Sequence, residues 1–347
     1  MNKDIATEKE VTIYDIAKEL DLSPATVSRA LNGNELVKEK TRKKIADVAE
    51  KLGYRVNSFA KDIRTGKTKT LGVIVHELNS KFVTSVISGI EKVASLSGYD
   101  IIIGHSMESK FKERQNVANL FNKRVDGLLA SLAFDTDNWN HYQPLINKNV
   151  PIVFYDRVFL DGPFTKITLD NFKAGYEATE HLIVQGCRRI MHVTADTSKN
   201  VYRDRLEGYK AALKKYGLPI EDDLIRVTRL NEESGVEEGT NILSMKNRPD
   251  GVFVANDFCA VVIMNQLIES GVRIPEDVAF VGFNNEAICN IIRPKLSSII
   301  YSGQQMGEIA AKRLIDKLNG LIESEEEQHV VMQPTLVIRG SSMKKRH

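Results

Sequence analysis

The sequence has no run approaching the ~20 consecutive apolar residues that a membrane-spanning helix needs. Its composition is ordinary for a globular chain, with 42% hydrophobic and 27% charged residues. The first ten residues are polar and of mixed charge, so they lack the apolar core of a secretory signal. These absences disfavour a membrane protein and a secreted one. We therefore expect a cytoplasmic protein with no membrane partner.

Cysteine is scarce, with only Cys187, Cys259 and Cys289. The three lie far apart in apolar surroundings and show no C-x-x-C spacing, so buried, reduced thiols are expected. The seven histidines are scattered without the spacing of metal ligands. We therefore predict no redox or zinc chemistry and no cofactor.

The motifs of several enzyme classes are also missing. No G-x-G-x-x-G follows the first strand-like run and no Walker glycine–lysine loop occurs, so the usual nucleotide sites have no anchor. G-x-S-x-G and H-E-x-x-H are absent as well. We expect a protein that is not an enzyme. An enzyme acting on a sugar or nucleotide is the alternative, which turnover of a bound ligand would revive.

The charge that is present is distributed unevenly. The net charge is only +2, but residues 1–70 carry four more positive than negative charges and the remainder carries two more negative ones. A chain of 347 residues also exceeds one ordinary core, so two or three units are expected. The asymmetry is typical of a phosphate-binding module attached to a neutral body, although a solvated charged surface gives the same pattern.

Two short helices are predicted near the amino terminus from their capping signals. Thr12 with Asp15 resembles a capping box, which opens a helix that ends near Asp21. Ser23 is a good N-cap, and Pro24 suits the first helical position, where its missing N–H has no partner to lose. A second helix therefore begins three residues after the first one ends.

The second helix stops at Asn32-Gly33, and a third is predicted from about Lys38 to Leu52. The second helix turns small polar side chains and one arginine outward: Ala25, Thr26, Ser28 and Arg29. This pattern indicates a helix-turn-helix whose second helix can enter a major groove of DNA, where the arginine can donate two hydrogen bonds to a guanine. A helical bundle with a polar face is the alternative.

The segment that follows, Asn57 to Thr70, is basic and has little apolar content. By itself it is a linker with room for one or two helical turns, or a solvated tether.

Beyond the linker, apolar strand-like runs alternate with amphipathic helices, and the order restarts at Ala174. This alternation predicts parallel sheets with helices on both faces. The phrase that begins at Val125 (VDGL) is echoed by the one at Pro249 (PDGV), each before a buried strand. The fold class expected is α/β: an all-α helix-turn-helix head plus a core of two doubly wound parallel-sheet lobes, like that of periplasmic binding proteins.

Polar residues follow the strands at the edge where such sheets bind ligands. They are His76-Glu77, His105-Ser106, Ser131 and Asp156-Arg157 in the first lobe, and Ala195-Asp196, Asn256-Asp257 and Asn284-Asn285 in the second. Two lobes facing each other across these residues predict a cleft that closes on a small polar molecule. Any one of them is equally well explained as a helix cap. A periplasmic-type solute receptor and an architectural DNA protein are rival interpretations.

These features resemble the lactose-repressor (LacI/GalR) family of bacterial regulators over nearly the whole chain. VTIYDIAKELDLSPATVSRALNG is similar to the family's DNA-binding signature, and RRIMHVTA, RLEGYKAAL, GVFVANDF, DVAFVGFN and PTLVIRGSS follow in the family's order. The resemblance implies a transcriptional regulator, expected to be a repressor, that binds a palindromic double-stranded DNA operator as a homodimer under allosteric control by a small-molecule effector. A sugar or sugar derivative is the expected effector. A tetramer stays open.

The resemblance also implies roles for single residues in DNA binding. Backbone contact or support of the reading helix falls to Thr12, Tyr14, Ser23, Thr26, Ser28 and Asn32, and base reading to Pro24, Ala25 and Arg29. Residues 57–64 match a hinge helix that folds on the operator. Its members include Asn57, with Ala60 packing the paired hinge and Ile63 as the wedge in the minor groove, where the family usually has leucine.

The effector positions of the family fall on His76, Phe82, Asp156, Arg205, Asn256, Asn284 and Tyr301. Two positions depart from the family: Asn284 stands where an aspartate is frequent, and Leu230 where some sugar binders have a stacking aromatic. The implied domains are a head of residues 1–56 and a hinge of residues 57–70. The first lobe is then 71–167 with 297–325, and the second is 168–296 with 326–342.

Overall fold

The computed structural model describes residues 11–54, 67–322 and 329–344. The chain divides into a small unit, residues 1–68, and a large unit, residues 69–347. The small unit is helical, and the large unit contains two six-stranded sheets with helices between the strands. The predicted fold class is confirmed.

The small unit, or head, has three helices: α1 (Ile13–Leu20), α2 (Pro24–Leu31) and α3 (Glu39–Lys51). The backbone N–H of Thr12 donates to the Asp15 carboxylate at 2.8 Å, and the Ser23 hydroxyl accepts from the N–H of Thr26 at 3.2 Å. These caps satisfy N–H groups that have no partner within their own helices, which is why α1 and α2 begin where the sequence predicts. The buried core of the head is Ile16, Ala17, Val27, Ala30, Val37, Ile45 and Ala49.

The first sheet has the order β11-β5-β4-β3-β1-β2, and every neighbouring pair is parallel. Alternate residues of β1 face opposite ways: Val73 packs in the core cluster that holds α5 and α12, while Ile74 packs in the one that holds α6 and α7. The elements are β1 (Thr70–Val75), α5 (Lys81–Leu96), β2 (Asp100–His105), α6 (Lys110–Asn122), β3 (Gly127–Ala130), α7 (Gln143–Ile146), β4 (Ile152–Tyr155), β5 (Thr165–Leu169), α12 (Gly303–Leu318) and β11 (His329–Met332).

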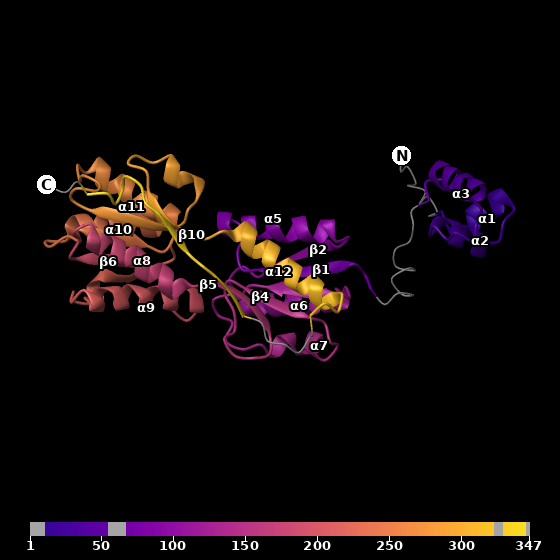
Figure 1. The fold of residues 1–347 in the computed structure, drawn as a ribbon, viewed down its shortest axis with the longest axis horizontal. Coiled ribbons are helices and arrows are strands. Elements are labelled where there is room, and N and C mark those ends of the chain that lie inside the picture. Colours follow the sequence, from indigo (N-terminus) through magenta and orange to yellow (C-terminus); the bar gives the residue numbers. More distant parts are fainter. Residues whose placement is uncertain (1–10, 55–66, 323–328, 345–347) are drawn as a thin grey trace, which may run out of the picture. The chain divides into compact units, whose positions relative to one another are not determined.

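The second sheet has the order β12-β10-β9-β8-β6-β7, and only the pair β10–β12 is antiparallel. Helices α8 and α9 cover one face and α10 and α11 the other (Figure 1). The elements are α8 (Asn171–Val184), β6 (Ile190–Thr194), α9 (Asn200–Lys215), β7 (Ile225–Val227), α10 (Glu232–Ser244), β8 (Gly251–Val254), α11 (Asp257–Glu269), β9 (Ala279–Asn284), β10 (Ser297–Ile300) and β12 (Thr335–Val337).

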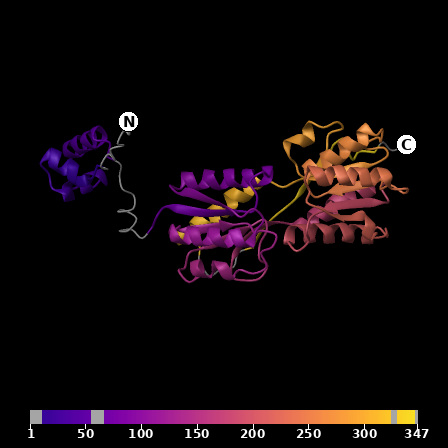
Figure 2. The same cartoon turned by 180° about the vertical axis from the view of Figure 1, so that it is seen from behind.

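The strand pairing moves two of the lobe boundaries that the sequence suggested. Ser297–Ile300 pairs with β9 and so belongs to the second sheet, although we assigned residues 297–325 to the first lobe. His329–Met332 pairs with β5 in the first sheet, although we assigned residues 326–342 to the second lobe. The sheet to which a strand belongs is determined by the strand with which it forms hydrogen bonds. The hydrophobic pattern of the sequence predicts a strand but does not identify that partner. Figure 2 shows the carboxyl-terminal segment, in yellow, running from one lobe to the other.

Two helix pairs approach closely because each helix offers a glycine. A Cβ added to Gly175 of α8 would lie 2.1 Å from the carbonyl oxygen of Arg205 on α9. In the first lobe, a Cβ on Gly89 of α5 would lie 2.1 Å from the carbonyl oxygen of Gln304, and one on Gly307 of α12 would lie 2.1 Å from that of Val86. Only glycine permits such backbone contact, so each pair packs as one block.

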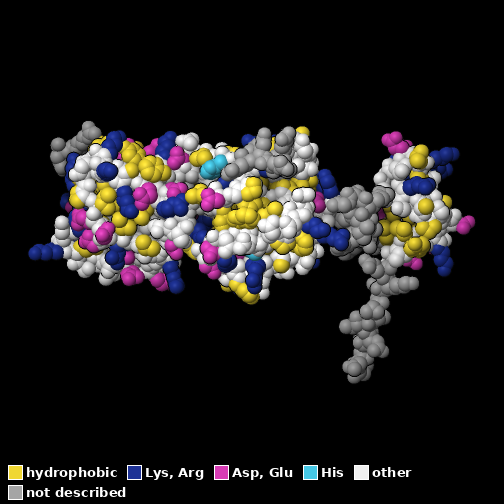
Figure 3. Space-filling view, turned by 90° about the horizontal axis from the view of Figure 1, so that it is seen from below, with side chains coloured by type: hydrophobic (Ala, Val, Ile, Leu, Met, Phe, Trp, Pro, Cys, Tyr) yellow, Lys and Arg dark blue, Asp and Glu magenta, His cyan; other side chains and the backbone are white. Residues whose placement is uncertain are grey.

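The surface of the large unit carries charges of both signs. Figure 3 shows lysine and arginine side chains interspersed with aspartate and glutamate on one face, with hydrophobic side chains between them. Within the described part of the chain, no helix combines the length and apolar character needed to cross a membrane.

Candidate nucleic-acid surface and ligand site

The predicted DNA-contacting residues of the head are accessible to solvent. Ala25 and Arg29 of α2 are exposed, and Thr26 and Ser28 are partly exposed, while Val27 and Ala30 face the core. On the neighbouring elements Tyr14 is 68% exposed, Thr12, Ser23 and Asn32 are exposed, and Pro24 is partly exposed. Within the described residues, the Arg29 side chain has no ion pair, so its guanidinium is available to a ligand.

Two of these residues also hold the turn geometry. The Ser23 hydroxyl lies 2.8 Å from that of Thr26 besides accepting its N–H, and the Asn32 amide donates to the carbonyl of Ser28 at 2.7 Å. Their hydrogen bonds fix the first and last turns of α2. The three hinge predictions, Asn57, Ala60 and Ile63, lie outside the described residues.

In the large unit, the structure brings Asp156 of the first lobe together with Tyr301, which directly follows β10 of the second lobe. The Tyr301 hydroxyl donates to Oδ1 of Asp156 at 2.6 Å, and both side chains are buried. Burial raises the pKa of Asp156, while the charge of Arg157 and the Tyr301 hydrogen bond oppose that rise. Phe82 stacks on the Tyr301 ring with centroids 4.2 Å apart. These three predicted residues form one cluster.

Arg205 of α9 lies in the same cluster. Its Nε donates to the Asn171 side chain at 2.8 Å and its Nη1 to the carbonyl of Ala255 at 3.2 Å. The guanidinium lies over the Phe283 ring at 3.5 Å and 5.8 Å from the Tyr301 ring. A buried arginine held in this way keeps the plane of its guanidinium fixed.

The other three predicted positions are placed less centrally. His76 Nδ1 lies 3.0 Å from the Ser131 hydroxyl, and burial, aided by the charge of Arg157, lowers the pKa of its imidazole well below 6.5, so the ring is neutral at pH 7. The Asn256 side chain accepts the N–H of Cys259 and so caps α11. Asn284 has φ 106 and donates to Glu286 over a long 3.4 Å.

Leu230, at the position of the missing stacking aromatic, is buried in the core beneath α10 and α11. It offers no aromatic face to a ligand.

The sequence placed Arg157 at a strand end beside Asp156, but it was not among the assigned effector positions. Its guanidinium makes two 2.8 Å hydrogen bonds to the Glu108 carboxylate and lies 3.9 Å from the Phe134 ring. Phe134 in turn stacks on Tyr202 of the second lobe. A cation–aromatic contact between segments so distant in sequence has no local signal.

Asn200, at the start of α9, also joins the two lobes and was missed. Its amide donates to the carbonyl of Asp156 at 3.0 Å, and its side-chain oxygen accepts the N–H of Val158 at 3.1 Å. Next to it, Lys199 donates to the carbonyl of Thr136. The amino-terminal end of α9 is therefore bonded to two loops of the first lobe.

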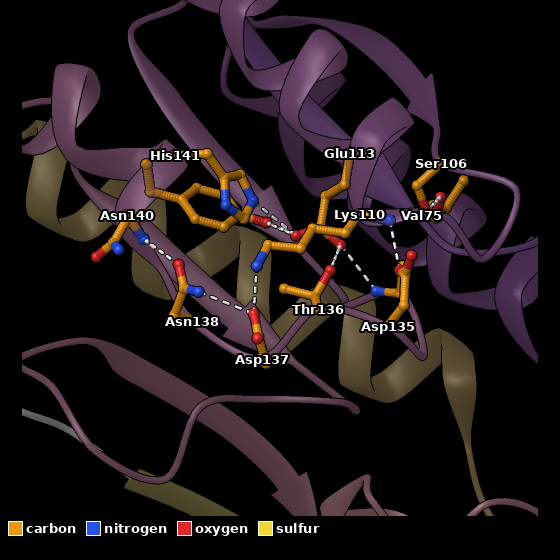
Figure 4. Close-up of polar contacts among 12 residues, drawn as sticks. Val75, Ser106, Lys110, Glu113, Asp135, Thr136, Asp137, Asn138, Asn140 and His141 are labelled. Carbon is orange, nitrogen blue, oxygen red and sulfur yellow. Dashed lines mark hydrogen bonds and ion pairs between the residues drawn. The ribbon is translucent and has the colours of Figure 1, made fainter.

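Glu113 of α6 fixes one of those loops (Figure 4). The buried carboxylate accepts from the N–H of Ala133 at 2.8 Å, the Thr136 hydroxyl at 3.1 Å and the Tyr142 hydroxyl at 2.9 Å, and lies 2.8 Å from Nε2 of His141. This network holds the loop after β3 in the position that Lys199 contacts.

Comparison with known proteins places this architecture in context. Residues 12–57 match the family model described as bacterial regulatory proteins, lacI family, and residues 179–342 match one described as a periplasmic binding protein-like domain. Catabolite control protein A of Priestia megaterium is 32% identical over 310 residues, which cover 89% of this chain and 93% of that protein.

Two solved structures are similar along nearly the whole chain. The lac repressor dimer bound to operator and the anti-inducer ONPF superposes with a TM-score of 0.86 at 25% identity, covering 96% of this chain and 100% of that one. The complex of the transcriptional regulator CelR with cellobiose gives a TM-score of 0.72 at 26% identity, with the same coverage.

Proposed function

The chain belongs to the lacI family of bacterial regulatory proteins, and we propose that it represses transcription by binding a palindromic operator as a homodimer whose DNA affinity a sugar controls. It is a DNA-binding transcriptional regulator; the proposal concerns how it reads DNA, what it senses and how it assembles. The observation that carries the proposal is that one chain contains both an exposed, arginine-bearing face on α2 and a buried cluster of Asp156, Tyr301 and Arg205.

For DNA reading, α2 enters the major groove with Arg29 and Ala25 toward the bases. Arginine donates two hydrogen bonds to a guanine edge, and alanine contacts a thymine methyl. The hydroxyls of Thr12, Tyr14, Ser23, Thr26 and Ser28 and the amide of Asn32 contact phosphates, which position the head without reading sequence. Asn57, Ala60 and Ile63 act in the hinge, with Ile63 as the minor-groove wedge.

For effector binding, the cluster offers a sugar the groups it needs. The Asp156 carboxylate accepts from hydroxyls, Arg205 and the Asn256 and Asn284 amides donate to oxygens, and the Phe82 and Tyr301 rings suit the apolar face of a sugar ring. His76 contributes a neutral imidazole. The cellobiose complex of the similar regulator CelR supports a sugar as the ligand class.

For assembly, the edge strand β2 supports a homodimer. Ile102 and Ile103 on this strand, and Met107 and Phe111 just beyond it, are exposed apolar side chains on one end of the first lobe. An exposed apolar edge strand of this kind favours association with another chain. A second copy of this chain related by a two-fold axis matches the symmetry of a palindromic operator. The boundaries of head, hinge and lobes given by the sequence, adjusted at β10 and β11, are part of this proposal.

We further propose that the ligand is bound without turnover and that the protein acts in the cytoplasm, where its DNA partner lies. A serine does lie beside a histidine at the site, but Ser131 is fully buried and lies 3.0 Å from Nδ1 of His76, the ring nitrogen that the aspartate of a hydrolytic triad would hold. The Asp156 carboxylate therefore does not orient the imidazole as an aspartate does in a hydrolytic triad.

The experiment that tests the proposal is selection of bound duplexes from a random pool by the full-length protein, followed by titration of the selected duplex at fixed salt. We expect an inverted repeat, and an affinity that changes when cellobiose, D-glucose or D-ribose is added. No enrichment of an inverted repeat, or no response to any sugar, contradicts the corresponding half of the proposal. Incubation of each sugar with the protein, followed by chromatography, checks for turnover.

A further inference from the structure

The loop after β9 presents a carboxylate, that of Glu286, which neither the sequence pattern nor the family resemblance assigned. The backbone of this loop is fixed on several sides. The N–H of Asn285 donates to the Ser298 hydroxyl at 3.0 Å, and the Arg339 guanidinium donates to the Asn285 side chain at 2.6 Å. The N–H of Glu286 donates to the buried Asp257 carboxylate at 2.8 Å. These hydrogen bonds therefore hold the backbone of Glu286 in a defined position.

The carboxylate itself has unused acceptor capacity. It is partly buried, and its one hydrogen bond within the described residues is the 3.4 Å contact from the Asn284 amide. An ionised carboxylate has about four acceptor positions, so several remain open. Burial raises the pKa of Glu286, as expected of a carboxylate that has lost water without gaining full replacement.

The surroundings place this carboxylate toward the first lobe. The positive charge that acts on Glu286 is that of Lys81, the first residue of α5. Lys81 directly precedes Phe82, which stacks on Tyr301. Glu286 thus lies beside Asn284, a predicted effector position of the second lobe, and feels the charge of Lys81 at the amino-terminal end of α5 in the first lobe.

We propose that Glu286 is a specificity-determining residue of this site, and that its carboxylate accepts hydrogen bonds from two neighbouring hydroxyls of a sugar. It supplies, two residues later, the acidic group that relatives often have at the position of Asn284. The inference rests on the proposed function, because it names a residue that reads the sugar. A carboxylate left unpaired in a partly buried site rejects an analogue that lacks the hydroxyl, which is how specificity arises here.

The test is calorimetric titration of the full-length protein with cellobiose, D-glucose and D-ribose, and then of variants with the sugar that binds most tightly. Because hydrogen bonds to a charged group are worth about 1.5 to 3 kcal/mol, Glu286→Gln is expected to weaken binding about 10- to 100-fold. Glu276→Gln, an exposed glutamate of the same lobe, is the matched control and leaves affinity unchanged. The double variant Asn284→Asp/Glu286→Gln moves the carboxylate to position 284, where relatives often have it, and is expected to restore most of the affinity for the sugar.

Monodeoxy derivatives of the same sugar separate a direct contact from a structural effect. The wild type is expected to lose affinity for at least one of them, and Glu286→Gln is expected to bind that derivative and the parent sugar alike. Equal binding of the parent sugar by wild type and Glu286→Gln overturns the inference while the sugar proposal stands. A loss of the same size for the parent and every derivative overturns it too. If the wild type binds none of the sugars, the proposed function fails first, and the inference with it.

Discussion

Replacing Tyr301 by phenylalanine tests whether Asp156 is ionised in the folded protein. The substitution removes one hydroxyl, which donates to Asp156 over 2.6 Å where both side chains are buried. A hydrogen bond to a charged group contributes about 1.5 to 3 kcal/mol to stability, against about 1 kcal/mol for a neutral one. At pH 7.5 we therefore expect Tyr301→Phe to lower the free energy of unfolding by about 1.5 to 3 kcal/mol.

The loss should depend on pH in a definite direction. Burial raises the pKa of Asp156 above its value in the unfolded chain, and the Tyr301 hydrogen bond partly opposes that rise. The folded state therefore binds a proton more tightly than the unfolded state, so this group favours folding more as pH falls through the raised pKa. Removing the Tyr301 hydroxyl raises the pKa of Asp156 further, so protonation of Asp156 at lower pH stabilises the variant more than the wild type. The difference between variant and wild type should shrink toward pH 5.

The assay is urea unfolding at pH 7.5 and pH 5, followed by circular dichroism and by the fluorescence of the single tryptophan, Trp139, which packs on Phe164 in the first lobe. Tyr209→Phe is the matched control, because its buried hydroxyl donates to the neutral carbonyl of Ile190 at 2.7 Å. That variant is expected to lose about 1 kcal/mol at both pH values. Equal losses for the two variants, or a loss at Tyr301 that grows as pH falls, would refute an ionised Asp156.

Three further substitutions follow from the structure. Arg29→Ala removes the exposed guanidinium of α2 and should relax base preference by about 1 to 3 kcal/mol at one position of each half-site; repeated duplex selection checks this, and an unchanged consensus would exclude Arg29 as a reader. Gly175→Ala places a methyl group 2.1 Å from the Arg205 carbonyl, so it should cost about 1 to 3 kcal/mol of stability and weaken sugar binding as α9 shifts; urea unfolding and calorimetry measure both, and wild-type values would mean that the backbones need not touch. Ile103→Lys puts a charge on the exposed β2 edge and should convert the dimer to a monomer in sedimentation velocity; a dimer that persists would place the interface elsewhere.

The head could be predicted from the sequence because its signals are local. The cap of α2 by Ser23, the proline that follows and the inward side chains Val27 and Ala30 all act within one or two helical turns. Leu31, at the end of the same helix, is only partly buried but packs against the same core. Alternation of strands and helices likewise fixed the layered form of both lobes, because buried parallel strands need apolar runs.

The ligand site could be predicted only in part. Tyr301 and Asp156 are 145 residues apart, and the family resemblance, not any pattern in the residues, suggested that they share a site. Asn200 and the contacts of Arg157 were missed because their partners are backbone groups, a carboxylate and rings on other segments, and such pairs are set by tertiary packing. The placement of β10 and β11 was missed for the same reason.

The close contact between α5 and α12 has a mechanical consequence. Phe82 lies at the amino-terminal end of α5, and Tyr301 immediately precedes α12, so the two stacked rings are attached to the same ends of two helices that touch backbone to backbone at Gly89 and Gly307. A molecule that pushes either ring cannot tilt one helix alone. It acts on both helices together, and their opposite ends, at Leu96 and Leu318, lie one 16-residue helix length of about 24 Å away.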